Sequence, residues 1–172
     1  AASDVYKRQE LKELAEQWNI PVTTSIEGKS AFPEDHPLSL GSGGRANSRP
    51  VKRYLEESDL ILGLGVSFAL TAFGVPMPPG KKIIHATLDP MDLNKDVPAD
   101  IGLIGDAKLT LAALNSELSN ADNSKAAARA DEPEKINQLK EEWMQEWLPK
   151  LTNNEAPINP YRVVAELNQL VD

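Results

Sequence analysis

The stretch Asp59-Leu-Ile-Leu-Gly-Leu-Gly65 is the first of three short apolar runs that decide the fold. The second run is Lys82-Ile-Ile-His-Ala-Thr-Leu88, followed by Asp89-Pro90, and the third is Ile101-Gly-Leu-Ile-Gly105, followed by Asp106-Ala107. Each run is long enough for a β-strand but too short for a helix, and its apolar residues do not alternate with polar ones. This pattern is typical of strands buried on both faces, in a parallel sheet with helices on both faces.

The carboxyl ends of these strands are where the sequence predicts a site. In an open parallel sheet, ligands bind in the crevice outside the carboxyl ends of the strands. All three runs end in small or acidic residues, which leave space and offer hydrogen-bonding groups. The candidate binding residues after the three runs are Gly65, Val66 and Ser67, then Thr87 and Asp89, then Asp106 and Ala107.

The composition excludes several classes of protein. The 172 residues suffice for one domain with an appendage, and the formal net charge of -8 argues against nucleic acid and anionic membranes as partners. The absence of cysteine excludes a disulfide scaffold, a zinc ribbon and a cysteine nucleophile. No apolar run approaches the roughly 20 residues of a membrane span, and no apolar signal segment is present. We therefore expect a cytoplasmic protein.

The residues on the amino-terminal side of the three runs predict one more helix and one more strand. Apolar residues at helical spacing indicate a helix over Glu10–Trp18, whereas the preceding residues show no clear pattern. Ile20–Ser25 is predicted as a strand that joins the other three in one sheet. Glu27–Leu40 is predicted as a loop, in which His36 is interpreted as a solvated surface group. His85, inside the second run, is interpreted as a histidine satisfied within the core.

A glycine-rich segment, Gly41-Ser-Gly-Gly44, precedes a helix predicted over Ser48–Glu57. Free backbone N–H groups ahead of a helix N-terminus can hold a phosphate, which makes Gly41, Gly43 and Gly44 candidate binding residues. The alternative is a flexible turn with glycine at positive φ. No strand directly precedes the segment, so it does not match the dinucleotide-binding fingerprint.

The C-terminal third predicts a helical tail. Asp106 is expected to cap a helix over Ala107–Leu118, which completes a domain over residues 10–118. The small and charged residues 119–133 indicate a linker without a core of its own. Residues 134–172 are predicted to contain two amphipathic helices. The first carries the stripe of Trp143 and Trp147, which we expect to be partly exposed or buried in a self-association contact, and the second turns Val163, Val164, Leu167 and Leu170 inward.

Several motifs together resemble the central domain of thiamine-diphosphate-dependent enzymes, most closely the acetolactate synthase large-subunit group. The motifs are Pro21-Val-Thr-Thr24, the segment Gly28–Gly41, Asp59–Val66, Ile83-Ile-His85, Asp89-Pro90 and Gly105-Asp-Ala107. The resemblance covers Glu10–Leu118, and Ile158–Val171 is similar to the opening of that family's pyrophosphate-binding domain.

The resemblance implies a Rossmann-like parallel sheet that holds part of an FAD in acetolactate synthases, and ADP or nothing in some relatives. Thiamine diphosphate and Mg²⁺ belong to other domains of such enzymes, whose activating glutamate and metal motif we do not find in this sequence. We therefore expect no catalytic residue and no metal ligand here, and a fragment that is inactive alone. The implied partners are the remaining domains of a parent enzyme, itself a homo-oligomer.

The family's FAD contacts transfer to this sequence at some positions only. Gly65 and Val66 match the segment after the central strand, and Asp106 and Ala107 also match. Ser67 stands where the family has an arginine, and Thr87 stands where an acidic residue is often found.

Three functions remain open from the sequence. The first is a fragment of a thiamine-diphosphate enzyme, the second is a stand-alone nucleotide-binding module, and the third is a structural interface domain with an empty crevice. A yellow colour on purification would separate the first two from the third, because the fold alone does not decide function.

Overall fold

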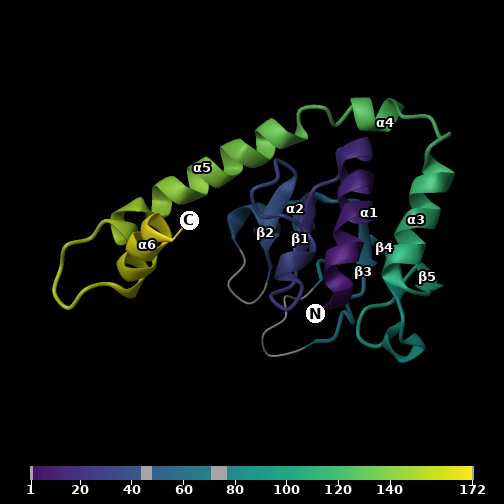
Figure 1. The fold of residues 1–172 in the computed structure, drawn as a ribbon, viewed down its shortest axis with the longest axis horizontal. Helices are drawn as coiled ribbons and strands as arrows, with labels where there is room; N and C mark the ends of the chain where they lie inside the picture. Colours follow the sequence, from purple (N-terminus) through teal and green to yellow (C-terminus); the bar gives the residue numbers. More distant parts are fainter. Residues whose placement is uncertain (1, 44–47, 71–76, 172) are drawn as a thin grey trace.

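Short parallel strands and helices make up the first two thirds of the chain, and helices alone follow β5 in the described residues (Figure 1). The structure, a computed structural model, describes residues 2–43, 48–70 and 77–171, with side chains from residue 8 onward. Gly44 therefore lies outside the described residues. The elements in chain order are α1 (Ala2–Trp18), β1 (Val22–Thr24), η1 (Lys29–Ala31), β2 (Ser39–Ser42), α2 (Arg49–Glu57), β3 (Leu60–Leu64), β4 (Lys82–Thr87), η2 (Pro90–Asp92), β5 (Ile101–Ile104), α3 (Ala107–Leu118), α4 (Ser124–Ala127), α5 (Glu132–Leu151) and α6 (Pro160–Leu170).

The three apolar runs form one parallel sheet in the order β3–β4–β5, as predicted. The prediction that the strand after Trp18 joins the same sheet is wrong for the described part of the chain. That strand, β1, pairs in parallel with β2 instead, in a separate two-stranded sheet. β1 has only three residues and its register shifts after Val22, so it offers few backbone groups for a second partner.

Strand β2 lies where the sequence predicts a loop and a glycine-rich turn. Leu40 is the one large apolar side chain in the strand, and Gly41 has a φ of +87°, so the segment carries little strand signal. Its pairing depends on β1: the hydroxyl of Thr23 donates to the carbonyl of Gly41 at 2.9 Å, and the Thr24 and Ser42 hydroxyls lie 3.2 Å apart.

One apolar cluster joins α1, α3 and α4 to β3. It contains Leu14, Trp18, Leu111 and Ala126, with Leu62 and Leu64 packed against it. Figure 1 shows α1 and α3 side by side, with α4 at one end of them. Because Ala126 is 5% exposed, the predicted linker does take part in a core. Arg129 strengthens this attachment, since its guanidinium donates to the carbonyl of Trp18 at 2.9 and 3.1 Å.

A second apolar cluster joins β2 to the helices α1, α2 and α5. Its buried members are Ala15, Phe32, Leu38, Leu40, Val51 and Ile136. The first half of α5 therefore packs on the body of the domain through Ile136. Its second half extends away from the strands, and α6 folds back on its end (Figure 1).

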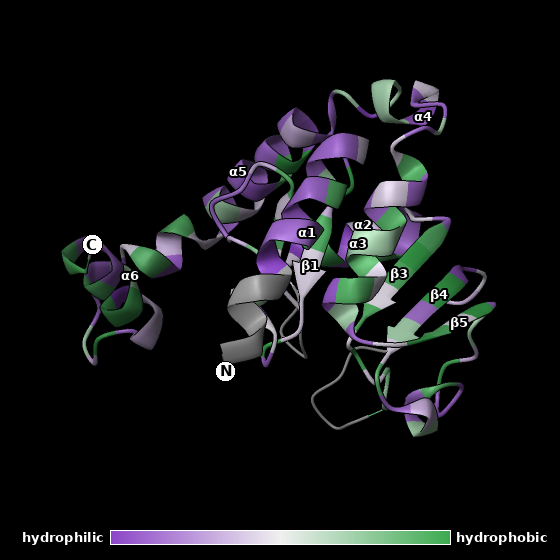
Figure 2. Ribbon diagram, turned by 45° about the vertical axis from the view of Figure 1, so that its right-hand side comes forward, coloured by the Kyte–Doolittle hydropathy of each residue, from purple (hydrophilic) through white to green (hydrophobic). Residues whose placement is uncertain are grey.

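The end of the tail exposes its apolar residues, as Figure 2 illustrates with green segments in α6. Trp143 and Trp147 are partly exposed, as predicted, and their rings meet edge to face. The prediction of an inward stripe on the last helix is wrong. Its members are 40–80% exposed, namely Val163, Val164, Leu167 and Leu170. Tyr161 alone supplies an aromatic contact from α6 to Trp147, so α6 has little of this chain to pack against.

Tyr54 connects α2 to the start of α5, and its hydroxyl donates to Oε2 of Glu132 at 2.7 Å. Burial, this hydrogen bond and the negative charge of Glu132 raise the pKa of Tyr54 above its usual range. An unfolded chain releases the tyrosine proton near pH 10, whereas the folded chain keeps it. The free energy of unfolding therefore falls as the pH rises above about 10.

We expect Tyr54→Phe to lower the free energy of unfolding by about 1 kcal/mol at neutral pH, with the deficit shrinking above about pH 10. Urea unfolding at a series of pH values measures this difference. Tyr161→Phe is the matched control and should follow the wild-type pH profile, because the exposed Tyr161 makes a ring contact that phenylalanine can keep. A constant deficit for Tyr54→Phe across the alkaline range would contradict the assignment.

Candidate functional site

The carboxyl edge of the β3–β4–β5 sheet brings several of the predicted site residues together. The N–H of Gly65 donates to the carbonyl of Ala86 at 2.8 Å, and the N–H of Gly105 donates to the carbonyl of Thr87 at 3.0 Å. Both hydrogen bonds continue the ladders one residue beyond the strands. Gly65, Thr87 and Asp106 consequently follow one another along this edge.

Gly65 leaves the backbone open at the end of β3. Its φ of +62° favours glycine, and a Cβ atom placed there would have no atom within 4 Å. A ligand can therefore approach the chain closely at this point. The next two residues are held in place, because the carbonyl of Val66 accepts a hydrogen bond from His85 and the Ser67 hydroxyl accepts one from the N–H of Ala69 at 3.3 Å.

His85 supports the site from beneath. It is 0% exposed, in agreement with its predicted place in the core, and its Nε2–H donates to the carbonyl of Val66 at 2.6 Å. Its Nδ1 is buried and has no hydrogen-bond partner in the described part of the chain, so the prediction of a satisfied histidine holds for one nitrogen only. Its ladder neighbours are Gly63 and Gly102, and the Phe68 ring meets it edge to face at 4.9 Å.

The acidic residues at the next two strand ends are helix caps. Oδ1 of Asp89 accepts from the N–H of Met91 at 2.9 Å, and Oδ1 of Asp106 accepts from the N–H groups of Lys108 and Leu109 at 2.9 and 3.3 Å. The predicted cap at Asp106 is therefore confirmed. Both caps use Oδ1 of the carboxylate. Ala107 follows as the first residue of α3.

The glycine-rich segment belongs to the other sheet. The N–H of Gly43 donates to the carbonyl of Thr24 at 2.7 Å, and the N–H of Gly41 donates to the hydroxyl of Ser39 at 3.2 Å. These two N–H groups are thus engaged within the protein and are not free to hold a phosphate. The sequence could not reveal this, because it gave no sign that β1 and β2 pair.

Between residues 2 and 171, outside the gaps at 44–47 and 71–76, there is no group of three or more His, Cys, Asp or Glu side chains that could hold a metal ion. None of the helices in the described ranges combines the length and the apolar character that crossing a membrane requires.

Parallel strands flanked by helices, with polar groups gathered at the carboxyl edge, define a Rossmann-like domain. The chain belongs to the family described as "Thiamine pyrophosphate enzyme, central domain", whose profile matches residues 3–114. This agrees with the resemblance seen in the sequence motifs.

Curated relatives of the chain are acetolactate synthase subunits. It is 33% identical over 172 residues to the probable acetolactate synthase large subunit of Methanococcus aeolicus, covering 95% of this chain and 28% of that protein. It is 32% identical over 166 residues to the probable large subunit of Methanocaldococcus jannaschii, covering 95% of this chain and 27% of that protein. It is 30% identical over 164 residues to acetolactate synthase 1, chloroplastic, of Zea mays, covering 94% of this chain and 25% of that protein. The chain thus spans about a quarter of the length of these relatives.

Proposed function

We propose that this chain is the central domain of an acetolactate synthase-like enzyme that decarboxylates and joins 2-keto acids. The chain supplies a structural core and a nucleotide-binding crevice, and the catalytic residues come from other domains. Thiamine diphosphate and Mg²⁺ are held by those domains, which are also the natural partners of the exposed tail, within a homo-oligomer. The observation that carries the proposal is the match of 95% of the chain to acetolactate synthase large subunits.

We further propose that FAD or ADP binds at the carboxyl edge of the strands. The diphosphate lies beside the open backbone of Gly65, between the segment Gly65–Ser67 and the end of β2. The adenosine lies near Thr87, where Oδ2 of Asp89 and Oδ2 of Asp106 can accept hydrogen bonds from ribose hydroxyls or the adenine amine. When bound, FAD would bring a flavin ring to the enzyme, and this chain's residues bind and orient its adenosine end.

The charge of this crevice predicts weak binding. Ser67 offers a hydroxyl where a guanidinium would form a charge-assisted contact with a diphosphate, a difference of roughly 1.5–3 kcal/mol. The N–H groups of Gly41 and Gly43, which are engaged within the protein, do not offset this loss. We expect dissociation constants for FAD and ADP in the micromolar to millimolar range. These correspond to free energies of binding on the order of -8 to -4 kcal/mol.

Calorimetric titration of FAD and ADP against the wild type and Gly65→Val tests this site. Because a valine side chain fills the approach path at Gly65, we expect the variant to lose binding. Gly80→Val is the matched control: Gly80 has a φ of +78° and an equally open Cβ position, but it lies before β4, at the opposite end of the sheet. The Gly80→Val variant should have the same backbone strain as Gly65→Val and should still bind FAD and ADP.

Equal binding by wild type and Gly65→Val would place the nucleotide elsewhere. Equal loss in both valine variants would mean that strain, and not occlusion, removes binding. If the wild type binds neither nucleotide at millimolar concentration, the crevice is structural, and the chain acts as an interface domain within its family.

A further inference from the structure

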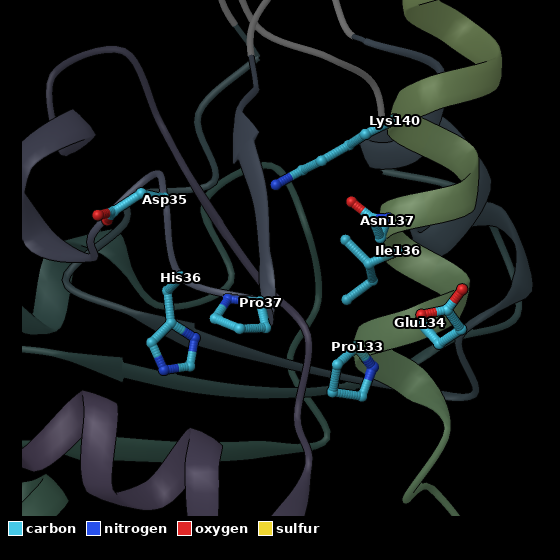
Figure 3. A pocket seen from close by; sticks show the side chains of 8 residues that line it. All are labelled: Asp35, His36, Pro37, Pro133, Glu134, Ile136, Asn137 and Lys140. Carbon is cyan, nitrogen blue, oxygen red and sulfur yellow. The ribbon is translucent and has the colours of Figure 1, made fainter.

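One cavity is lined by residues of α5 and of the loop that precedes β2. It has a volume of about 330 Å³ and lies between α5 and the segment Asp35–Pro37, which precedes the amino end of β2 (Figure 3). Pockets for small ligands start at about 300 Å³, so this cavity suits a compact molecule. It lies outside the residues proposed for the nucleotide.

One face of α5 forms one wall of this cavity. Pro133, Ile136 and Lys140 follow one another at intervals of three and four residues, and Asn137 lies next to Ile136, so they share one side of the helix. Pro37 stands opposite and completes an apolar floor with Pro133 and Ile136 (Figure 3). Such a floor suits a short aliphatic group.

His36 holds the opposite wall in place. The N–H of Leu38 donates to its Nδ1 at 3.1 Å, so the ring proton lies on Nε2, which donates to Oε1 of Glu16 at 3.1 Å. Its side chain is 11% exposed, so the interpretation of His36 as a solvated surface group is wrong. Both ring nitrogens are engaged, which makes this wall a fixed surface and not a source of further hydrogen bonds.

Among the described residues, Lys140 is the one cation that lines the cavity. Its side chain is partly buried, and Figure 3 shows it extending away from α5, with its ammonium well above Pro37 in this view. It forms no hydrogen bond or ion pair with the described residues. Burial lowers the pKa of Lys140, against the attraction of Glu34, which raises it. Glu34 itself is occupied, since it pairs with Lys29 at 3.4 Å and accepts from the Ser42 hydroxyl at 2.9 Å.

The two carboxylates at the rim of the cavity, Asp35 and Glu134, do not pair with the ammonium of Lys140. The Asp35 carboxylate points away from the centre of the cavity in Figure 3. Oε1 of Glu134 accepts from the Gln138 side chain at 3.1 Å, which holds it along α5. Partial burial makes the ammonium of Lys140 less favourable, and an anion beside it would offset this cost.

We propose that this cavity binds a small aliphatic carboxylate. The carboxylate of the ligand pairs with the ammonium of Lys140, and its hydrocarbon part packs on Pro37, Pro133 and Ile136. The apolar floor favours an organic anion over an inorganic one. The site joins α5 to the loop before β2, so its occupation stabilises the attachment of the tail to the domain.

Titration with butyrate tests this proposal, with the uncharged isostere butyramide as the comparison. The Ile136 methyl signal of the full chain, followed by NMR, reports on occupation of the cavity. We expect butyrate to shift this signal saturably, and butyramide to bind at least about tenfold more weakly. Lys140→Met keeps the length and the apolar stem of the side chain and should weaken butyrate binding by at least about tenfold. Lys150→Met is the matched control, because Lys150 lies further along α5, over the Trp147 ring.

Three results would overturn the proposal. They are equal affinities for butyrate and butyramide, unchanged butyrate binding by Lys140→Met, and no shift of Ile136 up to about 100 mM butyrate. The comparison of butyrate with butyramide uses the wild type alone, so it tests the proposal even if a variant fails to fold.

Discussion

Gly63→Ala should lower the free energy of unfolding by about 2 kcal/mol, although alanine is ordinarily the better residue inside a strand. Gly63 is buried in β3, and a Cβ atom there would lie 2.3 and 2.4 Å from two atoms of the Phe68 ring. The ring would have to move, but it packs edge to face on His85, and Phe68 has a φ of +50°. The clash and the lost ring contact outweigh the gain in strand propensity.

Urea unfolding measures this effect as a lower midpoint with an unchanged slope. In the background of Phe68→Ala the loss should be much smaller, because the ring is gone and only the contact at 2.9 Å with Cγ1 of Val66 remains, so a double-mutant cycle isolates the clash with the ring. Gly102→Ala on the other side of His85 is a graded control, since its Cβ would lie 2.9 Å from one atom of Leu93. An equal loss from Gly63→Ala in both backgrounds would contradict this account of Gly63.

The sequence predicts best where one segment carries its own signal. The apolar runs at β4 and β5 are found within one residue of their predicted limits. The predicted burial on both faces fits β4 but is wrong for β5, whose Ile101 and Ile104 are about half exposed in the described chain. The cap at Asp106 is equally local. By contrast, β2 depends on hydrogen bonds from β1, and its own residues Ser39–Ser42 are those of a turn.

The same distinction applies to the candidate sites. Residues at the ends of strands can be predicted to share an edge, because parallel strands align their carboxyl ends, and Gly65, Thr87 and Asp106 do so. The cavity at Lys140 lies between two segments about a hundred residues apart in the sequence. From the sequence of either segment alone, Lys140 cannot be told from a solvated lysine on the surface of a helix. The sequence also could not show that the amides of Gly41 and Gly43 bond within the protein.

Replacing His85 should have the largest effect of any single substitution considered for this chain. His85→Ala removes a fully buried ring, which leaves a cavity beneath the Phe68 ring and leaves the Val66 carbonyl without its donor. We expect a loss of about 3 kcal/mol in the free energy of unfolding. His85→Leu should lose only about 1 kcal/mol, because leucine fills much of the space and also removes the unpartnered Nδ1.

The leucine variant then separates stability from ligand binding. Because the hydrogen bond from His85 fixes the Val66 carbonyl directly after Gly65, its loss frees the segment against which the diphosphate is proposed to lie. His85→Leu should therefore bind FAD or ADP several-fold more weakly at a temperature where it is fully folded. Urea unfolding and calorimetric titration on the same samples measure the two effects. If His85→Leu loses as much stability as His85→Ala, the Val66 hydrogen bond and not the volume of the ring dominates. If it binds nucleotide as the wild type does, the segment after β3 is held by other contacts.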